Sequence, residues 1–536
     1  MKRDSIFRIG PKMIGPPRGD KALMGFKGFN LARMARLGLP VPPAFVLGTP
    51  LCRRWRKEPE RSRKNMAAVL EEQMSWLQSA TGLGFGDPRN PLLVSVRSGA
   101  PVSMPGMLDT LLNIGLCDAT ARGLLRTTGN PRLVWDSYRR LVALFAEVVF
   151  SANPQPFRSA LETMLAKERL DRSQELDFQS LTELTRTYLH LFQEVTGNPF
   201  PQNPLRQLEL AVQAVLASWD SPRAGEYRRL YELSDDLCTA VTIQKMIFGN
   251  AGGTSGAGVG FTRDPDTGEK KLYFDFLFNS QGEDIVSGRT TGSDADRLVS
   301  SLPEIQRDLG NISAVLESVF GDVQEFEFTV QDGVLYLLQT RTAKRTPWAA
   351  LRIAVELAEE GIIDKSEALA RLEGLPLKDI KRRRLVTHGK PPLCRGQVSG
   401  SGVAIGPMAL DLEAVRRFSS MGNEPPVLVR DEMTTADIAG IALSAGVLTA
   451  RGNRTSHAAV VARQLGKTCI TGCGGLRVDY VRRIVRIGDF SLAEGDLITL
   501  DSGSGNVFSG ALNVVTDYPK KWLNEIRKWR LSVGVE

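Results

Sequence analysis

The chain has 536 residues, of which 68 are basic and 60 acidic, so 68 − 60 gives a formal net charge of +8. Hydrophobic residues make up 42% and charged residues 24%, which argues for an ordinary globular protein and against disorder, collagen or a membrane bundle. The longest weakly polar run, residues 440–450, is far shorter than the ~20 residues that span a bilayer. We expect three or four domains of roughly 100–200 residues each, with no secretory signal and no membrane partner.

The cysteines and the basic residues indicate the cellular compartment and the class of partner. The six cysteines are scattered without a CxxC pair, which indicates free thiols in a reducing cytoplasm rather than a disulfide or zinc framework. The densest basic cluster, residues 378–384, has no RNA-binding aromatic motif or zinc-finger spacing beside it. We interpret this cluster as a solvated linker, expect no nucleic-acid partner, and note that many arginines also suit an enzyme that handles phosphate.

The first part of the chain mixes helix and strand. Residues 30–37 have a helical pattern that Gly38 can end. Residues 92–96 are typical of a buried strand that delivers Arg97 to a loop. Residues 117–218 repeat apolar side chains three and four apart and predict a helical insert.

Strands return after the insert. The predicted strands cover residues 240–248, 258–262, 271–278, 325–330 and 334–340. The next segment, 348–372, is rich in Ala, Glu and Leu and predicts a helix, and the basic cluster and Pro391-Pro392 after it mark a domain boundary. Residues 395–510 have a compact α/β pattern, and residues 520–529 predict a last helix.

Among the three histidines, His457 has the context of a nucleophile. His190 lies in a helical stretch and His388 in the basic linker, so both are expected to be structural or solvated. His457 follows a strand (446–450) and a polar turn and opens a helix, for which Ser456 is a plausible N-cap and Gly466 a plausible C′ residue. A helix N-terminus favours phosphate, and a neutral imidazole can act as a nucleophile. The alternative is a histidine that only caps a helix.

Two further patterns suit phosphate chemistry. The glycine-rich segment 249–260 lies between two strands and can fold over phosphates, although a mobile hairpin turn would look the same. Glu325 and Glu327 share one face of a strand, and Gln339 and Arg341 share one face of the next. Two carboxylates and an amide suit Mg²⁺, and an arginine suits the attached phosphates. The alternative is a solvent-facing sheet surface with a cross-strand Glu–Arg pair.

Several long motifs carry a family resemblance. The segment LTARGNRTSHAAVVARQLGKTCITGC resembles the phosphohistidine motif of the pyruvate, phosphate dikinase and phosphoenolpyruvate synthase family. The segments GFKGFNLARMARLGLPVPPAF, LLVSVRSGAPVSMPGMLDT, WDSYRR, GFTRDPDTGEKKLY, SQGED and YLLQTRTAKRT are similar to the nucleotide-binding region of that family and occur in the same order. The resemblance covers nearly all of the chain.

The resemblance implies an α/β (α+β) fold of two main domains. An ATP-grasp nucleotide-binding domain would span residues 1–345, with the helical insert at about 117–218. A helical and basic linker (346–392) would lead to a swivelling α/β phosphohistidine domain (393–512) and a C-terminal tail (513–536).

Site residues follow from the same resemblance. It implies ATP- or nucleotide-binding side chains at Lys27, Arg97, Glu283 and Arg341, with a further phosphate contact from either Arg139 or Arg140. It implies Mg²⁺ ligands at Glu327 and Gln339, with Glu325 beside them, and His457 as the catalytic nucleophile. Thr455 matches the position that regulatory kinases modify in plant relatives. Asn453 replaces a usual glycine, and Glu325 a usual aspartate.

The implied activity is an ATP- and phosphate-dependent phosphotransferase. His457 would take the β-phosphate of ATP, and AMP and pyrophosphate would be released. The family continues into a β/α barrel of about 200 residues or more, whereas 536 − 510 leaves 26 residues after Gly510. We therefore expect a separate pyruvate- or phosphoenolpyruvate-binding subunit as the partner. The alternatives are transfer to a non-pyruvate small molecule and a non-catalytic regulatory phosphocarrier.

Overall fold

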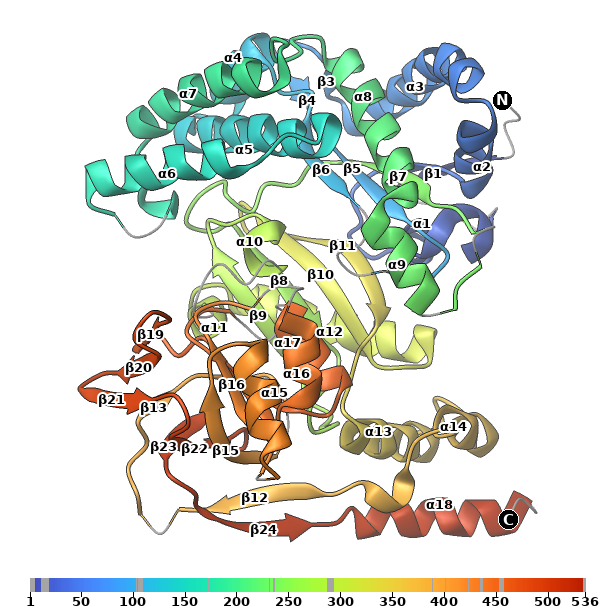
Figure 1. Cartoon of the computed structure of the whole chain (residues 1–536). Helices are drawn as coiled ribbons and strands as arrows, with labels where there is room; N and C mark the ends of the chain where they lie inside the picture. Colours follow the sequence, from blue (N-terminus) through green and yellow to red (C-terminus); the bar gives the residue numbers. More distant parts are fainter. Residues whose placement is uncertain are drawn as a thin grey trace. The chain divides into compact units, whose positions relative to one another are not determined.

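The structure, a computed structural model, describes residues 5–10, 19–102, 104, 109–170, 173–230, 232–234, 237–286, 294–387, 389–400, 402–422, 424–433, 437–452 and 457–533. The chain forms two compact units (Figure 1). The first comprises residues 1–256, 278–280 and 328–340, and the second comprises residues 257–277, 281–327 and 341–536. Helices and strands are mixed in both units, which confirms the predicted α/β (α+β) class.

The first unit is built on a five-stranded antiparallel sheet with the order β1-β2-β7-β5-β6. Its strands are Ile6–Ile9 (β1), Ala44–Leu47 (β2), Val94–Gly99 (β5), Thr110–Ile114 (β6) and Ala240–Lys245 (β7), and a short parallel pair is Gly84–Phe85 (β3) with Pro91–Leu92 (β4). Arg97 lies inside β5 and not in a loop after it, so that expectation is wrong. The strand extends to Gly99 because its ladder with β7 continues to that residue.

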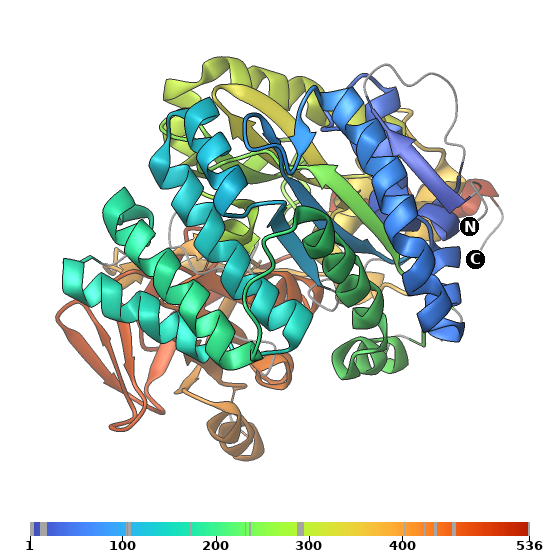
Figure 2. The same ribbon diagram turned by 90° about the horizontal axis from the view of Figure 1, so that it is seen from above.

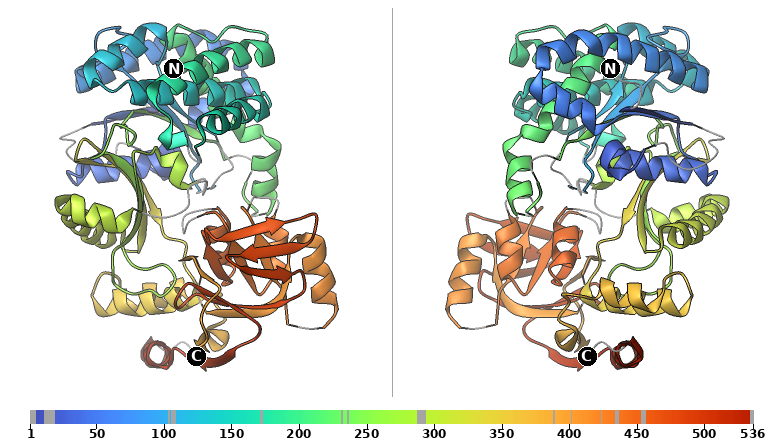
Figure 3. Two further views of the ribbon diagram at one scale, coloured as in Figure 1. Left: turned by 90° about the vertical axis from the view of Figure 1, so that its left-hand side faces the viewer. Right: turned by 90° about the vertical axis from the view of Figure 1, so that its right-hand side faces the viewer.

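Alternate side chains of this sheet face two helical layers. Phe45 and Ile243 belong to a large apolar core shared with the helices of one layer. Val46 and Thr242 point to the other face, where a Cβ added to Gly28 of α1 (Lys21–Arg36) would meet both side chains. In Figure 2 the helices of the first layer cover the strands, and Figure 3 shows α1 on the opposite side of the sheet.

Helix α1 begins nine residues before the predicted start at residue 30 and is interrupted at Gly25, whose φ of 69° is not helical. The Asp20 side chain accepts a hydrogen bond from the Leu23 amide and caps the first segment. The other helices of this unit are α2 (Thr49–Lys57), α3 (Pro59–Thr81), α4 (Asp118–Thr128), α5 (Pro131–Phe150), α6 (Gln155–Glu168), α7 (Phe178–Thr196), α8 (Pro204–Ala217) and α9 (Pro222–Leu230), with 3₁₀ turns η2 (Ser173–Glu175) and η3 (Ser218–Asp220). The helical pattern predicted over 117–218 is confirmed, since the described part of that range holds no strand.

A four-stranded sheet follows, with the order β11-β10-β8-β9. Its strands are Gly256–Phe261 (β8), Tyr273–Phe278 (β9), Gln324–Gln331 (β10) and Val334–Thr342 (β11), and the helices between them are α10 (Gly282–Val286), α11 (Ala295–Ser301) and α12 (Pro303–Phe320). The predicted strands are confirmed. Phe326 and Phe328 are buried in β10, and the Phe326 ring covers Gly260 of β8, but Glu325, between Gln324 and Phe326, is buried as well.

The α/β region of the second unit has an eight-stranded sheet with the order β13-β23-β22-β15-β16-β17-β18-β14. Its strands are Cys394–Arg395 (β13), Gln397–Val398 (β14), Val403–Ala409 (β15), Val427–Arg430 (β16), Gly446–Thr449 (β17), Thr468–Thr471 (β18), Leu497–Asp501 (β22) and Asn506–Ser509 (β23). Strands β15 to β18 run parallel. Three helices, α15 (Leu412–Ser420), α16 (Ile438–Leu443) and α17 (His457–Gln464), connect them, and β19 (Leu476–Asp479), β20 (Ile484–Ile487) and β21 (Phe490–Ala493) form a small antiparallel sheet.

The segment before this region is more structured than the sequence predicted. The helix expected over 348–372 is two helices, α13 (Pro347–Glu359) and α14 (Lys365–Arg371), separated at Gly361, whose φ is 71°. After the turn η4 (Leu377–Asp379), the basic cluster does not stay a solvated linker. It enters strand β12 (Arg382–Val386), which pairs with β24 (Asn513–Asp517). The predicted C-terminal helix is present as α18 (Lys520–Val533), and its apolar face packs on α13 and α14.

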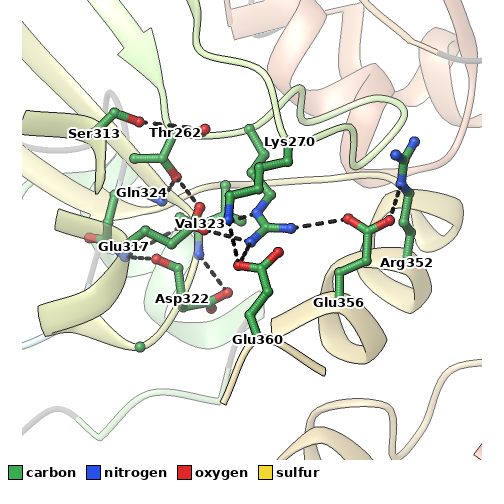
Figure 4. A network of polar contacts seen from close by, with 12 residues as sticks. Thr262, Lys270, Ser313, Glu317, Asp322, Val323, Gln324, Arg352, Glu356 and Glu360 are labelled. Carbon is green, nitrogen blue, oxygen red and sulfur yellow. Dashed lines mark hydrogen bonds and ion pairs between the residues drawn. The ribbon is translucent and has the colours of Figure 1, made fainter. Parts of the chain in front are cut away.

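A buried arginine joins the loop after β8 to α12 and α13 in the second unit. Arg263 is fully buried and donates hydrogen bonds to Glu317 at 2.6 Å and 3.0 Å, to Glu356 at 3.1 Å and to Glu360 at 2.8 Å. Figure 4 labels the three glutamates, Glu317, Glu356 and Glu360, within this polar network. Because Glu317 is itself almost fully buried, each charge depends on the others for compensation.

We predict that Arg263→Ala lowers the free energy of unfolding by about 3–5 kcal/mol, because it leaves the Glu317 carboxylate buried without its ion-pair partner. Urea unfolding curves measure the change. Lys270→Ala is the matched control, since Lys270 is exposed and contacts only Glu360 of these three carboxylates in the described network, and it is expected to cost less than ~1 kcal/mol. Equal losses in the two variants would contradict this account.

Candidate functional site

The predicted phosphate-binding residues of the first unit begin where α1 meets β5. Gly25 has a φ of 69°, and a Cβ built on it would lie 1.8 Å from the Gly99 carbonyl oxygen, so a larger residue does not fit there. The next amide, Phe26, donates to the Ala100 carbonyl at 2.8 Å. This close approach sets Lys27 beside β5, with its Cβ 3.5 Å from the position of a Cβ on Gly99.

Arg97 reaches from β5 to β11. Its Nη1 donates to the Leu338 carbonyl at 3.2 Å, and its Nη2 donates to Oε1 of Gln339 at 3.3 Å. The structure therefore brings together two predicted site residues that are 242 positions apart in the sequence. The Gln339 side chain is buried and keeps acceptor capacity on the same oxygen.

Asp136 binds both Arg139 and Arg140, the two arginines of which one was expected to contact a phosphate. Its carboxylate accepts from Arg139 Nη2 at 2.5 Å and from Arg140 Nε at 3.0 Å. Burial alone would raise the pKa of Asp136, but the Arg140 and Arg139 guanidinium groups outweigh it and hold the pKa below its usual range. Arg139 is almost fully buried and Arg140 is more open, so Arg140 is the better placed of the two to meet a ligand.

The glycine-rich loop is anchored at its base and open at its tip. Asn250 donates to the Asp136 carboxylate at 3.1 Å, and a Cβ on Gly249 would lie 2.2 Å from the Ser280 carbonyl oxygen. Among the described residues, nothing lies within 4 Å of a Cβ on Gly252 or Gly253. A backbone with a fixed base and no bulky neighbours at its tip can approach a phosphate closely. Sequence reasoning missed Asp136 and Asn250, although WDSYRR already placed the acid three and four residues before the arginines.

In the second unit, Glu325 and Arg341 form a pair across β10 and β11. Arg341 Nη2 donates to Oε1 of Glu325 at 2.5 Å, and both side chains are largely buried. This is the Glu–Arg pair that the sequence offered as an alternative, but it is shielded from solvent. Glu327 is half-buried on the same strand. Lys344, which sequence reasoning missed, lies close enough that partial desolvation and Arg341 lower its pKa.

The three side chains predicted as Mg²⁺ ligands all carry oxygen donors. Carboxylates of Glu325 and Glu327 and an amide oxygen of Gln339 are hard ligands of the type this cation prefers, so the residues fit the group chemically. In the part of the chain that the structure describes, no three His, Cys, Asp or Glu side chains cluster in a way that could hold a metal ion. The predicted set differs from such a cluster because an amide supplies one of its three ligands.

Two of the predicted residues are placed only by their backbone. Glu283 lies in the short helix α10, and its side chain is outside the described residues. His457 is the first residue of α17, as predicted, and Gly466 after the helix has a φ of 64°, as a C′ glycine does. Residues 453–456, which include Asn453, Thr455 and Ser456, lie outside the described residues, and so does His388.

The far end of α17 is fixed by an ion pair that sequence reasoning missed. Arg463 Nε donates to Oδ1 of Asp266 at 2.8 Å, and both side chains are almost fully buried. The Arg463 guanidinium also lies over the Phe261 ring, 5.7 Å from its centroid. The only sequence signal was a basic residue in the last turn of a helix. By contrast, His190 is an exposed residue of α7 beside Glu194, as expected for a solvated histidine.

No helix among the described residues has both the length and the apolar character needed to cross a membrane.

Comparisons with known proteins agree with the resemblance in the motifs. Residues 61–309 match the family described as "Pyruvate phosphate dikinase, AMP/ATP-binding domain", and residues 422–505 match "PEP-utilising enzyme, mobile domain". The chain is 39% identical over 541 residues to pyruvate, phosphate dikinase 2 of Zea mays, a match that covers 99% of this chain and 61% of that protein. It is 40% identical over 495 residues to pyruvate, phosphate dikinase of Clostridium symbiosum, with 91% and 56% covered.

The chain thus spans between half and two thirds of the length of these relatives. The two matched regions follow each other in the order that the motifs predicted, and the identity extends over nearly all of the chain. By these regions the chain contains an AMP/ATP-binding domain of the pyruvate, phosphate dikinase type and a mobile domain of the type found in PEP-utilising enzymes.

Proposed function

We propose that this chain is an ATP- and phosphate-dependent phosphotransferase that carries a phosphoryl group on His457. The observation that carries the proposal is the contact of Arg97 with Gln339, because two residues assigned to one nucleotide site from separate motifs meet through a hydrogen bond. Lys27 beside Gly99 and the anchored glycine-rich loop support the same assignment. The names of the relatives support pyruvate and phosphate as substrates.

Binding in this proposal is electrostatic. The triphosphate of ATP carries several negative charges, and Lys27, Arg97 and Arg140 would neutralise them in the first unit while Arg341 would act on the terminal phosphate. Glu325, Glu327 and Gln339 would hold Mg²⁺, which supplies further charge neutralisation at the phosphates when bound. The hydrogen bonds from Arg97 to Leu338 and Gln339 fix its guanidinium before ATP arrives, so less side-chain freedom is lost on binding.

The chemistry proposed for His457 has two steps. A neutral ring nitrogen attacks the β-phosphorus of ATP, a nitrogen–phosphorus bond forms, and the bond to the α-phosphate oxygen breaks to release AMP. Inorganic phosphate then attacks the outer phosphorus of the pyrophosphorylated histidine and leaves as pyrophosphate. One phosphoryl group remains on His457, ready for transfer to an acceptor.

We propose pyruvate as that acceptor, bound outside the regions described here. The described sheets are antiparallel or mixed, apart from the two-strand β3–β4 pair, and none of them is a ring of eight parallel strands that alternate with helices. The other two possibilities are a different small-molecule acceptor and a regulatory phosphocarrier that performs no onward transfer. A requirement for inorganic phosphate favours the dikinase-type reaction over transfer to a different small molecule.

The first prediction concerns the nucleophile. Incubation with ATP labelled at the β-phosphate is expected to give an acid-labile label on the full chain, because phosphohistidine hydrolyses in acid. His457→Ala is expected to abolish the label, whereas His190→Ala, which removes an exposed histidine, is expected to keep it. Label that persists in His457→Ala would show that the nucleophile is assigned wrongly.

The second prediction concerns Arg341. Arg341→Ala is expected to slow AMP formation by roughly 30- to 150-fold, which corresponds to the ~2–3 kcal/mol of a charge-assisted contact in the transition state. Arg345→Ala is the matched control, because Arg345 is an equally shielded arginine four residues later that is bonded to Asp322 at 2.6 Å. Near-normal AMP formation in Arg341→Ala would overturn the assignment of β11.

The third prediction concerns the acceptor. The homogeneous chain with ATP, phosphate and pyruvate is expected to form phosphohistidine but no phosphoenolpyruvate. Addition of a separate protein that carries the pyruvate-binding barrel of the family is expected to restore the product. The remaining pyruvate is removed after the reaction, and phosphoenolpyruvate is then measured by its coupled conversion to lactate. Phosphoenolpyruvate formed by residues 1–536 alone would refute the proposal of an outside acceptor site.

A further inference from the structure

Two thiols of the second unit lie in direct contact. All six cysteines are free, and the sulfur atoms of Cys394 and Cys473 are 2.7 Å apart. The two residues are 79 positions apart in the sequence, so the fold and not local chain geometry brings them together. Closing this contact to a disulfide of ~2.05 Å needs a sulfur displacement of less than about 1 Å.

The two thiols differ in access and acidity. Cys473 is fully buried in the apolar core of the α/β region, whereas Cys394 on β13 is half-buried and can meet solvent. The hydrogen bond from the Cys473 thiol lowers the pKa of Cys394, and the same contact together with burial raises the pKa of Cys473. Cys394 is therefore the thiol that reaches the reactive thiolate form first.

The pair lies close to the backbone of residues 449–452, which comes before His457 in the chain. The Cys473 amide donates to the Thr449 carbonyl at 3.0 Å, at the end of β17. A Cβ on the preceding Gly472 would lie 2.8 Å from the Gly452 carbonyl oxygen, so these two backbones are in close contact. Cys394 lies in β13 and pairs with Val507 of β23. Strand β13 follows the segment that joins this region to α13 and α14.

We propose that Cys394 and Cys473 form a reversible disulfide on exposure to hydrogen peroxide, and that a dithiol reopens it. The Cys394 thiolate attacks the peroxide, a sulfur–oxygen bond forms, the oxygen–oxygen bond breaks and water leaves. The Cys473 sulfur then attacks the sulfenic sulfur, the sulfur–sulfur bond forms and a second water leaves. The two thiols lose two electrons and two protons in total, and these reduce one hydrogen peroxide to two water molecules.

The disulfide would tie β13 to the backbone that contacts Thr449 and Gly452. A cross-link between residues so far apart removes freedom mainly from the unfolded chain and stabilises the region that it closes. We expect a higher thermal midpoint for the second unit after oxidation and slower amide exchange over residues 446–452. Neither readout depends on catalysis, so the test is independent of the proposed function.

The experiment uses the full chain treated with hydrogen peroxide, followed by alkylation of free thiols and mass spectrometry of the peptides. The expected product is one linked peptide pair that contains Cys394 and Cys473, is lighter by two hydrogen atoms and is separated again by dithiothreitol. Cys52 and Cys238 also contact each other, so the peptides are assigned individually to keep the two pairs distinct.

Two variants complete the test. Cys469→Ser is the matched control, because Cys469 is a buried thiol of the same region whose pKa burial raises to about 12, and it is expected to leave the cross-link intact. Cys394→Ser is expected to abolish it, with folding verified by circular dichroism. Sulfinic acid on Cys394 without a cross-link, or a Cys394 and Cys473 pair that stays reduced while other thiols oxidise, would overturn the proposal.

Discussion

The contact between Gly25 and the end of β5 is the constraint on which the candidate nucleotide site depends. A side chain at position 25 would overlap the Gly99 carbonyl oxygen, and the positive φ adds a second reason for glycine. Because the backbone of α1 comes this close, Lys27 lies beside the strand that carries Arg97. The constraint is purely steric, and it places two positive charges on adjacent elements before any ligand is present.

A second theme is that arginines of both units are held by oxygen partners. Asp136 orients Arg139 and Arg140, Glu325 orients Arg341, and Gln339 accepts from Arg97. A free guanidinium on a long side chain would lose rotamer freedom when it bound a phosphate, and like charges gathered without partners would repel one another. Fixed partners reduce both costs. The disadvantage is that a phosphate must compete for each arginine with the oxygen partner that orients it.

Strands and helices were predicted well where the periodicity of apolar residues was clear. They were predicted less well where contacts between residues distant in the sequence determine the structure. The strands around Glu325 and Gln339 and the helix at His457 are present as expected. The start of α1 was missed because GFKGF contains two glycines that weaken the helical pattern, although Asp20 caps it. The basic cluster was taken for a linker because nothing local showed that β12 would pair with β24, more than a hundred residues later.

The candidate site was predictable only as far as its motifs. Arg97 and Gln339 were assigned from separate motifs, and the hydrogen bond between them is a tertiary fact that no spacing contains. The orienting residue Asp136 was visible in WDSYRR, but its link to Asn250 of the glycine-rich loop was not. The same holds for Arg463, since a basic residue near a helix end gives no sign of a buried aspartate 197 positions away.

That last pair bears on the swivelling of the phosphohistidine domain that the family resemblance implies. Arg463 and Asp266 would have to separate if α17 left the loop after β8, and removing one partner of a buried pair by mutation costs about 3–5 kcal/mol. Movement differs from mutation, because both charges enter water together and recover their hydration. Their mutual attraction is then exchanged for solvation, and the net cost is far below that of one stranded charge. A buried ion pair can therefore fix the direction of α17 in one state and still release it, which a large apolar contact of the same area would not allow as readily.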